Sequence, residues 1–131
     1  MKWKDLLFST GLSANFYTAI TRQVFWRRAI IGMLDCVQCV PLKAKILDLG
    51  CGPGTSTFAL GARIPRPAQL TGIDLSGEMI EIARAAHQKD WSHLKHLSFT
   101  QGDAAHLPYP DQSFDLVFGH SFLYLVDDPV A

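Results

Sequence analysis

The sequence has no excess of charge of either sign and no long apolar run. Lysine and arginine together number 12, as do aspartate and glutamate, so the formal net charge is zero. This balance gives no electrostatic reason to expect a nucleic acid partner. No apolar stretch approaches the roughly 18 residues of a membrane span, and the run at residues 6–8 is too short for a signal-peptide core. We therefore expect a cytoplasmic protein without stable membrane insertion.

Cysteine is also scarce, with three residues at Cys36, Cys39 and Cys51. The first two have the CxxC spacing of redox and zinc sites, but there is no second pair to complete a zinc shell. His93 and His96 form a similarly weak pair that a solvated loop explains better. We expect no metal site. The CxxC pair is interpreted as two small apolar residues near a helix end, and the third cysteine as filling space in a glycine-rich loop.

The remaining composition is that of a globular protein, with 131 residues of which 48% are hydrophobic and 18% charged. Residues 1–41 are predicted to form an N-terminal helical segment. Ser13 is a candidate cap for a short first helix. A second, amphipathic helix is predicted over about 24–40 and ends at Pro41. Its apolar positions recur at steps of three and four: Trp26, Ala29, Ile30, Met33, Cys36, Val37 and Val40.

Residues 42–131 alternate between strand and helix patterns, which predicts an α/β fold. Short apolar runs indicate four strands, and helical patterns separate the first three of them. Strands joined in this way are parallel and connected by right-handed crossovers. The expected strands are 45–49, 70–73, 97–100 and 114–118, and the expected helices are 55–63 and one capped by Ser76.

Glycine and aspartate residues follow three of these strands where open α/β sheets bind ligands. Gly50, Gly52 and Gly54 lie in the segment ILDLGCGPGT, where they allow a sharp turn and close approach to a ligand. Asp74 ends the segment TGIDLS, and a carboxylate there can accept hydrogen bonds from ribose hydroxyls. Asp103, in QGDA, could accept from an adenine amino group. Each carboxylate alone could be a turn residue or a helix cap, but the glycine loop and the two carboxylates, at three successive strand ends, together indicate a nucleotide-like cofactor.

The spacing of the glycines separates two classes of cofactor. The loop reads GxGxG, whereas dinucleotide enzymes carry GxGxxG and place a pyrophosphate on a helix N-terminus. Asp48, two residues before the first glycine, would repel a pyrophosphate. It suits a ligand that carries an ammonium group and a sulfonium, as S-adenosylmethionine does.

In order and spacing, four segments resemble the motifs of class I S-adenosylmethionine-dependent methyltransferases: ILDLGCGPGT, TGIDLS, QGDAAHLPYPDQSFDLVF and HSFLYLVDDP. The resemblance covers roughly residues 44–129 and is strongest to the small-molecule branch that includes ubiquinone and menaquinone biosynthesis enzymes. It implies a Rossmann-like, three-layer α/β/α fold with a mostly parallel sheet of strand order 3-2-1-4-5-7-6. The chain ends at Ala131, after the fourth strand. We expect a fragment or a truncated gene product, with residues 42–131 as an incomplete S-adenosylmethionine-binding domain.

The resemblance also implies a role for each candidate site residue. The three glycines would hold the amino-acid end of the cofactor and Asp74 the ribose. The remaining cofactor contacts would be adenine packing by Leu75 and Met79, the adenine edge by Asp103 and Ala104, and a position near the methyl group for His120.

His120 and Tyr124 are also the candidate catalytic residues, because they follow the fourth strand at the expected mouth of the pocket. Either side chain could orient an acceptor, and a neutral histidine could take a proton from it. Alternatively, both pack within the fold.

The predicted function is methyl transfer from S-adenosylmethionine to a small organic acceptor. Such a transfer is an in-line displacement at an activated carbon, which depends mainly on positioning and needs no metal or triad. One alternative is a non-catalytic module that binds the cofactor or a partner. Another is an NAD-dependent oxidoreductase, which the GxGxG spacing and Asp48 disfavour.

Overall fold

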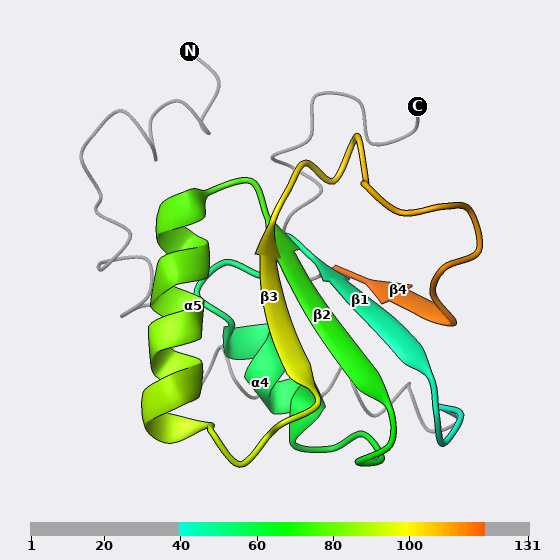
Figure 1. Cartoon of the computed structure of the whole chain (residues 1–131), viewed down its shortest axis with the longest axis horizontal. Helices are drawn as coiled ribbons and strands as arrows, with labels where there is room; N and C mark the ends of the chain where they lie inside the picture. The colour runs from blue at the N-terminus through cyan, green and yellow to red at the C-terminus, as the bar shows by residue number, and fades with distance from the viewer. Residues whose placement is uncertain (1–39, 120–131) are drawn as a thin grey trace.

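The computed structural model describes residues 40–119, which form a parallel sheet of four strands with two helices (Figure 1). The helices predicted within residues 1–39, with Ser13, Cys36 and Cys39, lie outside the described residues. In chain order the elements are β1 (Lys45–Leu49), α4 (Thr55–Gly61), β2 (Gln69–Asp74), α5 (Gly77–Asp90), β3 (Leu97–Gln101) and β4 (Leu116–Phe118).

The strands lie in the order β3-β2-β1-β4, and every neighbouring pair is parallel. This order confirms the α/β prediction and matches the first part of the expected family order. Asp48 of β1 pairs with Gly72 of β2 on one side and with Phe118 of β4 on the other. Because the chain moves from β1 to β2 to β3 in one direction, right-handed crossovers place α4 and α5 on the same face of the sheet. The described residues thus show the sheet and one helical layer.

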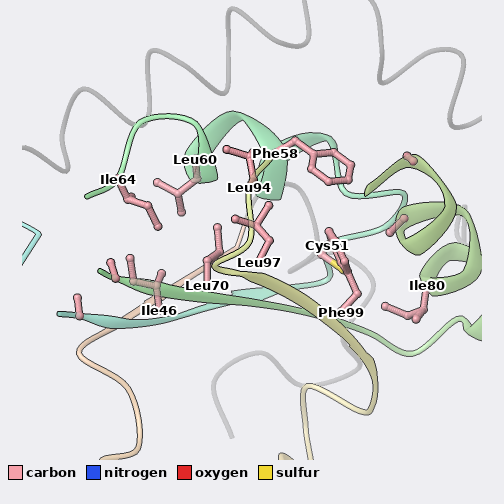
Figure 2. Close-up of a cluster of buried hydrophobic side chains, with 14 residues drawn as sticks. Ile46, Cys51, Phe58, Leu60, Ile64, Leu70, Ile80, Leu94, Leu97 and Phe99 are labelled. Carbon is pink, nitrogen blue, oxygen red and sulfur yellow. The ribbon is translucent and has the colours of Figure 1, made fainter. Parts of the chain in front are cut away.

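The hydrophobic core lies between that sheet face and the two helices (Figure 2). The ring of Phe58, from α4, stacks on Trp91 with ring centroids 5.2 Å apart and meets Phe99 edge-on at 5.4 Å. In β1, Ile46 faces this core, while its neighbour Leu47 is equally buried on the opposite face. Burial on both faces explains why the strand reads as a continuous apolar run and does not alternate.

The helix α5 begins as predicted. The Ser76 hydroxyl accepts a hydrogen bond from the Met79 amide at 3.3 Å, and Glu78 lies in the first turn, where the helix dipole favours a negative charge. Later in the helix, the Arg84 guanidinium donates to the carbonyl oxygen of Phe99 at 2.8 Å, which joins α5 to β3.

Two predicted element ends are wrong by two residues, and three strand ends, at β2 and β3, by one. The first helix ends at Gly61 and not at residue 63, because the amides of Arg63 and Ile64 both turn back to the carbonyl of Leu60. The fourth strand begins at Leu116 and not at residue 114. There the Asp115 carboxylate, in place of a backbone carbonyl, accepts from the Lys45 amide at 2.8 Å, so regular strand pairing starts one residue later.

The interpretation of the histidine pair as structural agrees with the fold. His96 bonds through Nε2 to the Gly61 carbonyl at 2.8 Å, and the His93 ring lies beside Trp91. Within residues 40–119, no group of three or more His, Cys, Asp or Glu side chains could hold a metal ion. No helix in this part of the chain is long and apolar enough to cross a bilayer.

Candidate functional site

The loops that follow β1, β2 and β3 meet at one edge of the sheet, where the three strands end (Figure 1). Two backbone hydrogen bonds join them. The Cys51 amide donates to the carbonyl of Ile73 at 3.0 Å, and the Gly102 amide donates to the carbonyl of Asp74 at 2.9 Å. The glycine loop, Asp74 and the segment that begins at Asp103 therefore lie side by side, as their spacing predicts.

The glycine loop has a backbone that other residues rarely adopt. Gly50, Gly52 and Gly54 have φ angles of 65°, 54° and 90°, all in the left-handed region that favours glycine. A Cβ atom at Gly54 would also lie 2.8 Å from the ring of Phe58. The third glycine therefore directs the chain into α4, which begins without a side-chain cap.

Gly72 was not singled out from the sequence, although it lies inside the TGIDLS segment. A Cβ atom there would be 3.0 Å from both Cβ and Sγ of Cys51 and 3.0 Å from the ring of Phe99. The absent side chain thus lets the glycine loop rest directly on β2. Its signal in the sequence is a glycine at the centre of a strand, which often marks the close approach of another backbone.

Asp74 is partly buried, and both of its carboxylate oxygens accept hydrogen bonds from backbone amides. Oδ2 accepts from the amide of Gly52 at 2.8 Å, and Oδ1 accepts from the amide of Ser76 at 2.9 Å. The carboxylate thereby joins the glycine loop to the start of α5. Asp74 and Ser76 are two residues apart, which is the separation of an Asx turn, so Asp74 does act as a turn residue. Its bond to Gly52, however, crosses to another loop.

Asp48 is fully buried at the end of β1, beneath the glycine loop. Its Oδ2 accepts from the hydroxyls of Ser56 at 2.8 Å and Thr57 at 2.7 Å, whereas its Oδ1 has no hydrogen-bond partner among residues 40–119. Burial is the largest influence on this group and raises its pKa to about 7; the hydroxyls of Thr57 and Ser56 lower the pKa, and the nearby charge of Asp74 raises it. A buried oxygen without a partner is costly unless a ligand or water supplies one.

Sequence reasoning missed Ser56 and Thr57. They lie two and three residues after the third glycine, in the first turn of α4, and their hydroxyls reach back eight and nine residues to Asp48. The available signal was a run of three hydroxyl residues, 55–57, after a glycine loop that is preceded by a carboxylate.

Cys51 fills space between the loop and β2, as expected. It is 4% exposed, and burial raises the pKa of its thiol far above the usual range. A thiol in this state is neutral and a poor nucleophile at physiological pH. The chemistry of this edge therefore rests on carboxylates and backbone amides.

Asp103 lies just beyond β3 in a tight turn. Its carboxylate accepts from the amide of Ala105 at 2.9 Å and bonds to Nδ1 of His106 at 3.0 Å. The hydrogen bond from His106, followed by that from Ala105, holds the pKa of Asp103 below its usual value. This side chain is about half exposed, so it remains accessible, as does the neighbouring Ala104, which is partly exposed.

The other predicted cofactor residues differ in exposure. Leu75 is 69% exposed, and its carbonyl accepts from Nε2 of Gln101 at 3.1 Å, while Met79 is only 8% exposed. An exposed leucine beside the ends of β2 and β3 suits packing on a ring system, whereas the methionine, in the first turn of α5, is buried. His120 and Tyr124 lie outside the described residues.

A hollow of about 270 Å³ lies between α4 and α5 and reaches the glycine loop at Pro53. None of the predicted cofactor residues within 40–119 lines it. Its walls are formed by Pro53, Thr55, Phe58, Ala59, Ala86, Asp90 and Trp91.

Comparison with known proteins gives consistent matches. Residues 46–131 match a family described as a methyltransferase domain. An uncharacterized methyltransferase of Schizosaccharomyces pombe is 36% identical over 131 residues, which is 97% of this chain and 45% of that protein. Demethylmenaquinone methyltransferase of Staphylococcus epidermidis is 35% identical over 92 residues, which is 70% of this chain and 35% of the enzyme. The chain thus spans less than half the length of these relatives.

Among solved structures, a putative S-adenosylmethionine-dependent methyltransferase from Methanococcus maripaludis superposes with a TM-score of 0.75. The match covers 88% of this chain and 52% of that protein, at 21% identity. At this identity the likeness shows the fold, and it agrees with the Rossmann-like sheet expected from the alternating pattern.

Proposed function

Because the chain belongs to the methyltransferase domain family, we propose that it binds S-adenosylmethionine and takes part in methyl transfer to a small organic acceptor. The family match confirms the resemblance found in the four sequence motifs. The observation that carries the proposal is the fully buried Asp48, with one unpartnered oxygen under a left-handed glycine loop. That arrangement suits a cofactor with a cationic amino-acid end.

The amino-acid end would be held by Asp48 and by the glycine loop. Burial raises the pKa of this carboxylate to about 7, and a nearby ammonium group would stabilise its charged form. A cationic ligand end is therefore favoured here. Gly50 and Gly52 have no side chains and allow the backbone to approach the ligand closely. A pyrophosphate, in contrast, would add negative charge beside Asp48 and Asp74.

The nucleoside end would be held by Asp74, Leu75 and the turn at Asp103. Asp74 would accept from ribose hydroxyls, and the exposed Leu75 would cover one face of the adenine. Asp103 would accept from the adenine amino group, with Ala104 beside it; its low pKa keeps it charged and therefore a strong acceptor at neutral pH. Met79 would support this surface from beneath.

The cofactor would supply a methyl group already activated by a sulfonium, so the chain's own residues mainly position the reactants. We propose His120 and Tyr124, which follow the fourth strand and Gly119, as the side chains that orient the acceptor. A neutral His120 would also take up a proton where the acceptor must lose one. An alternative consistent with the same sequence is that both residues only pack within the fold.

The acceptor is proposed to be a small organic molecule, since the relative from Staphylococcus epidermidis is a demethylmenaquinone methyltransferase. We further propose that the protein acts in the cytoplasm, without a nucleic acid partner, and that residues 42–131 form the cofactor-binding domain. A second candidate function is a non-catalytic module that retains the cofactor site.

Isothermal titration calorimetry of the 131-residue chain tests the cofactor. We expect S-adenosylhomocysteine to bind and NAD to give no heat. Binding of NAD without any response to S-adenosylhomocysteine would refute the proposal. Transfer of a radiolabelled methyl group to candidate quinol and carboxylate acceptors then separates an enzyme from a non-catalytic module.

A further inference from the structure

The carboxylate of Asp74 is already engaged before any ligand is considered. Its Oδ2 holds the amide of Gly52, in the loop after β1, and its Oδ1 holds the amide of Ser76, at the start of α5. Its backbone carbonyl accepts from Gly102, at the end of β3. One residue therefore joins all three loops of the candidate site.

The hydrogen-bonding capacity of a carboxylate permits this arrangement together with ligand binding. An ionised carboxylate has two oxygens with about four acceptor positions. The amides of Gly52 and Ser76 occupy one on each oxygen, so acceptor positions remain for hydroxyl groups. The side chain of Asp74 is only partly buried, which leaves it accessible from the site.

We propose that Asp74 is a positioning residue for the glycine loop as well as a ribose acceptor, and that it couples the two ends of the cofactor. The inference rests on the proposed function and deepens it. If it is correct, the loss of the carboxylate weakens binding of the amino-acid end, even for a ligand that has no ribose.

The geometry of the loop explains why the hydrogen bond from the Gly52 amide to Asp74 matters. Gly52 is buried and has a φ of 54°, in the left-handed region that is open to glycine. The neighbouring amides of Cys51 and Gly54 donate to backbone carbonyls, of Ile73 and Cys51 respectively. The amide of Gly52 instead donates to a side chain. The orientation of this one peptide therefore depends on a group that substitution can remove.

The substitution Asp74→Asn separates the two roles at nearly constant volume. Its carboxamide oxygen can accept from one backbone amide, but its NH₂ group cannot accept from the other. Asp74→Ala removes both acceptors. Asp115→Asn is the matched control, since Asp115 also accepts from a backbone amide, that of Lys45 at 2.8 Å, at the opposite end of β1.

Three ligands then report on different parts of the site. S-adenosylhomocysteine has both ends, 5′-methylthioadenosine has the ribose and adenine without the amino acid, and L-homocysteine has the amino acid without the ribose. We expect both Asp74 variants to bind all three less tightly, with L-homocysteine weakened about tenfold. Asp115→Asn should bind all three as the wild type does.

A ligand-free measurement accompanies the titrations. Amide hydrogen exchange should show faster exchange at Gly52 in Asp74→Asn than in the wild type, and no change at Gly52 in Asp115→Asn. This readout also applies if Asp74→Ala does not fold.

The outcomes separate the two proposals. If Asp74→Asn loses affinity for 5′-methylthioadenosine but keeps that for L-homocysteine, Asp74 is a ribose contact alone and the positioning role is overturned. Unchanged exchange at Gly52 overturns it equally. If the wild type binds none of the three ligands, the cofactor assignment fails, while the exchange experiment still decides whether Asp74 holds the loop.

Discussion

Asp48 should make the stability of the ligand-free protein fall as the pH rises from about 4 to 7. In the folded chain its pKa is about 7, and in the unfolded chain it returns to about 3.8. Between these values the native state binds more protons than the unfolded state, so the slope of unfolding free energy against pH is negative. The contribution is fully present below the unfolded pKa and is lost as the pH passes through the folded pKa.

The size of the effect follows from the shift. Three pKa units at about 1.4 kcal/mol each correspond to about 4 kcal/mol. Asp48 is fully buried, so solvent screening does not reduce this value as it would for a surface group. For a domain whose net stability is roughly 5–15 kcal/mol, a change of this size is readily measured.

Urea denaturation at several pH values between 4 and 8 is the appropriate assay, with Asp48→Asn measured in parallel. Other groups titrate in this range, so the informative quantity is the wild-type free energy minus that of the variant. We expect this difference to fall by about 4 kcal/mol from pH 4 to pH 8. The control Asp103→Asn should leave the negative slope in place. A wild-type-minus-Asp48→Asn difference that stays constant over this range would refute the reasoning.

Further predictions concern affinity, packing and turnover. Affinity for S-adenosylhomocysteine should fall as the pH drops below 7 and Asp48 becomes protonated; calorimetry that finds equal affinity at pH 6 and pH 8 contradicts this. Thr57→Val removes a hydroxyl that lowers the pKa of Asp48, so the pH midpoint of the stability change should move upward, and an unmoved or lower midpoint would count against the hydrogen bond. Gly54→Ala should cost about 1–3 kcal/mol, from its φ of 90° and the clash of its Cβ with an aromatic ring, and an unchanged thermal midpoint would disprove it. His120→Ala or Tyr124→Phe should lower kcat but keep cofactor affinity; wild-type kinetics in both would leave the transfer to proximity alone.

The strands and the meeting of their ends could be predicted from the sequence because these features are local. An apolar run such as that of β1, bounded by turn residues, indicates a buried strand without further information. Parallel strands place their carboxyl ends at one edge, so Asp74 and the glycine loop were expected to be neighbours. The cap at Ser76 depends only on residues within one helical turn, and it was also found.

The details that could not be predicted depend on contacts between distant segments. The bond from Gly52 to Asp74 joins residues 22 positions apart, and its partner atom cannot be deduced from spacing. The raised pKa of Asp48 requires knowledge of its burial, which sequence position alone does not provide. The start of β4 depends on Asp115, whose carboxylate accepts from the Lys45 amide while its own amide donates to the Lys45 carbonyl.

The bond from Arg84 to the carbonyl of Phe99 bears on how the sheet can grow. The amide of Leu70 bonds to the carbonyl of His96, and the amide of Gly102 to that of Asp74, so the even-numbered residues of β3 face β2. The carbonyl of Phe99 therefore points outward, where a charged donor already occupies it. A further strand pairing with this edge of β3 would have to displace the guanidinium of Arg84. Charged side chains at sheet edges protect proteins against edge-to-edge aggregation. Among the described strands, the outer edge of β3 is therefore capped at Phe99 by a charged side chain from α5.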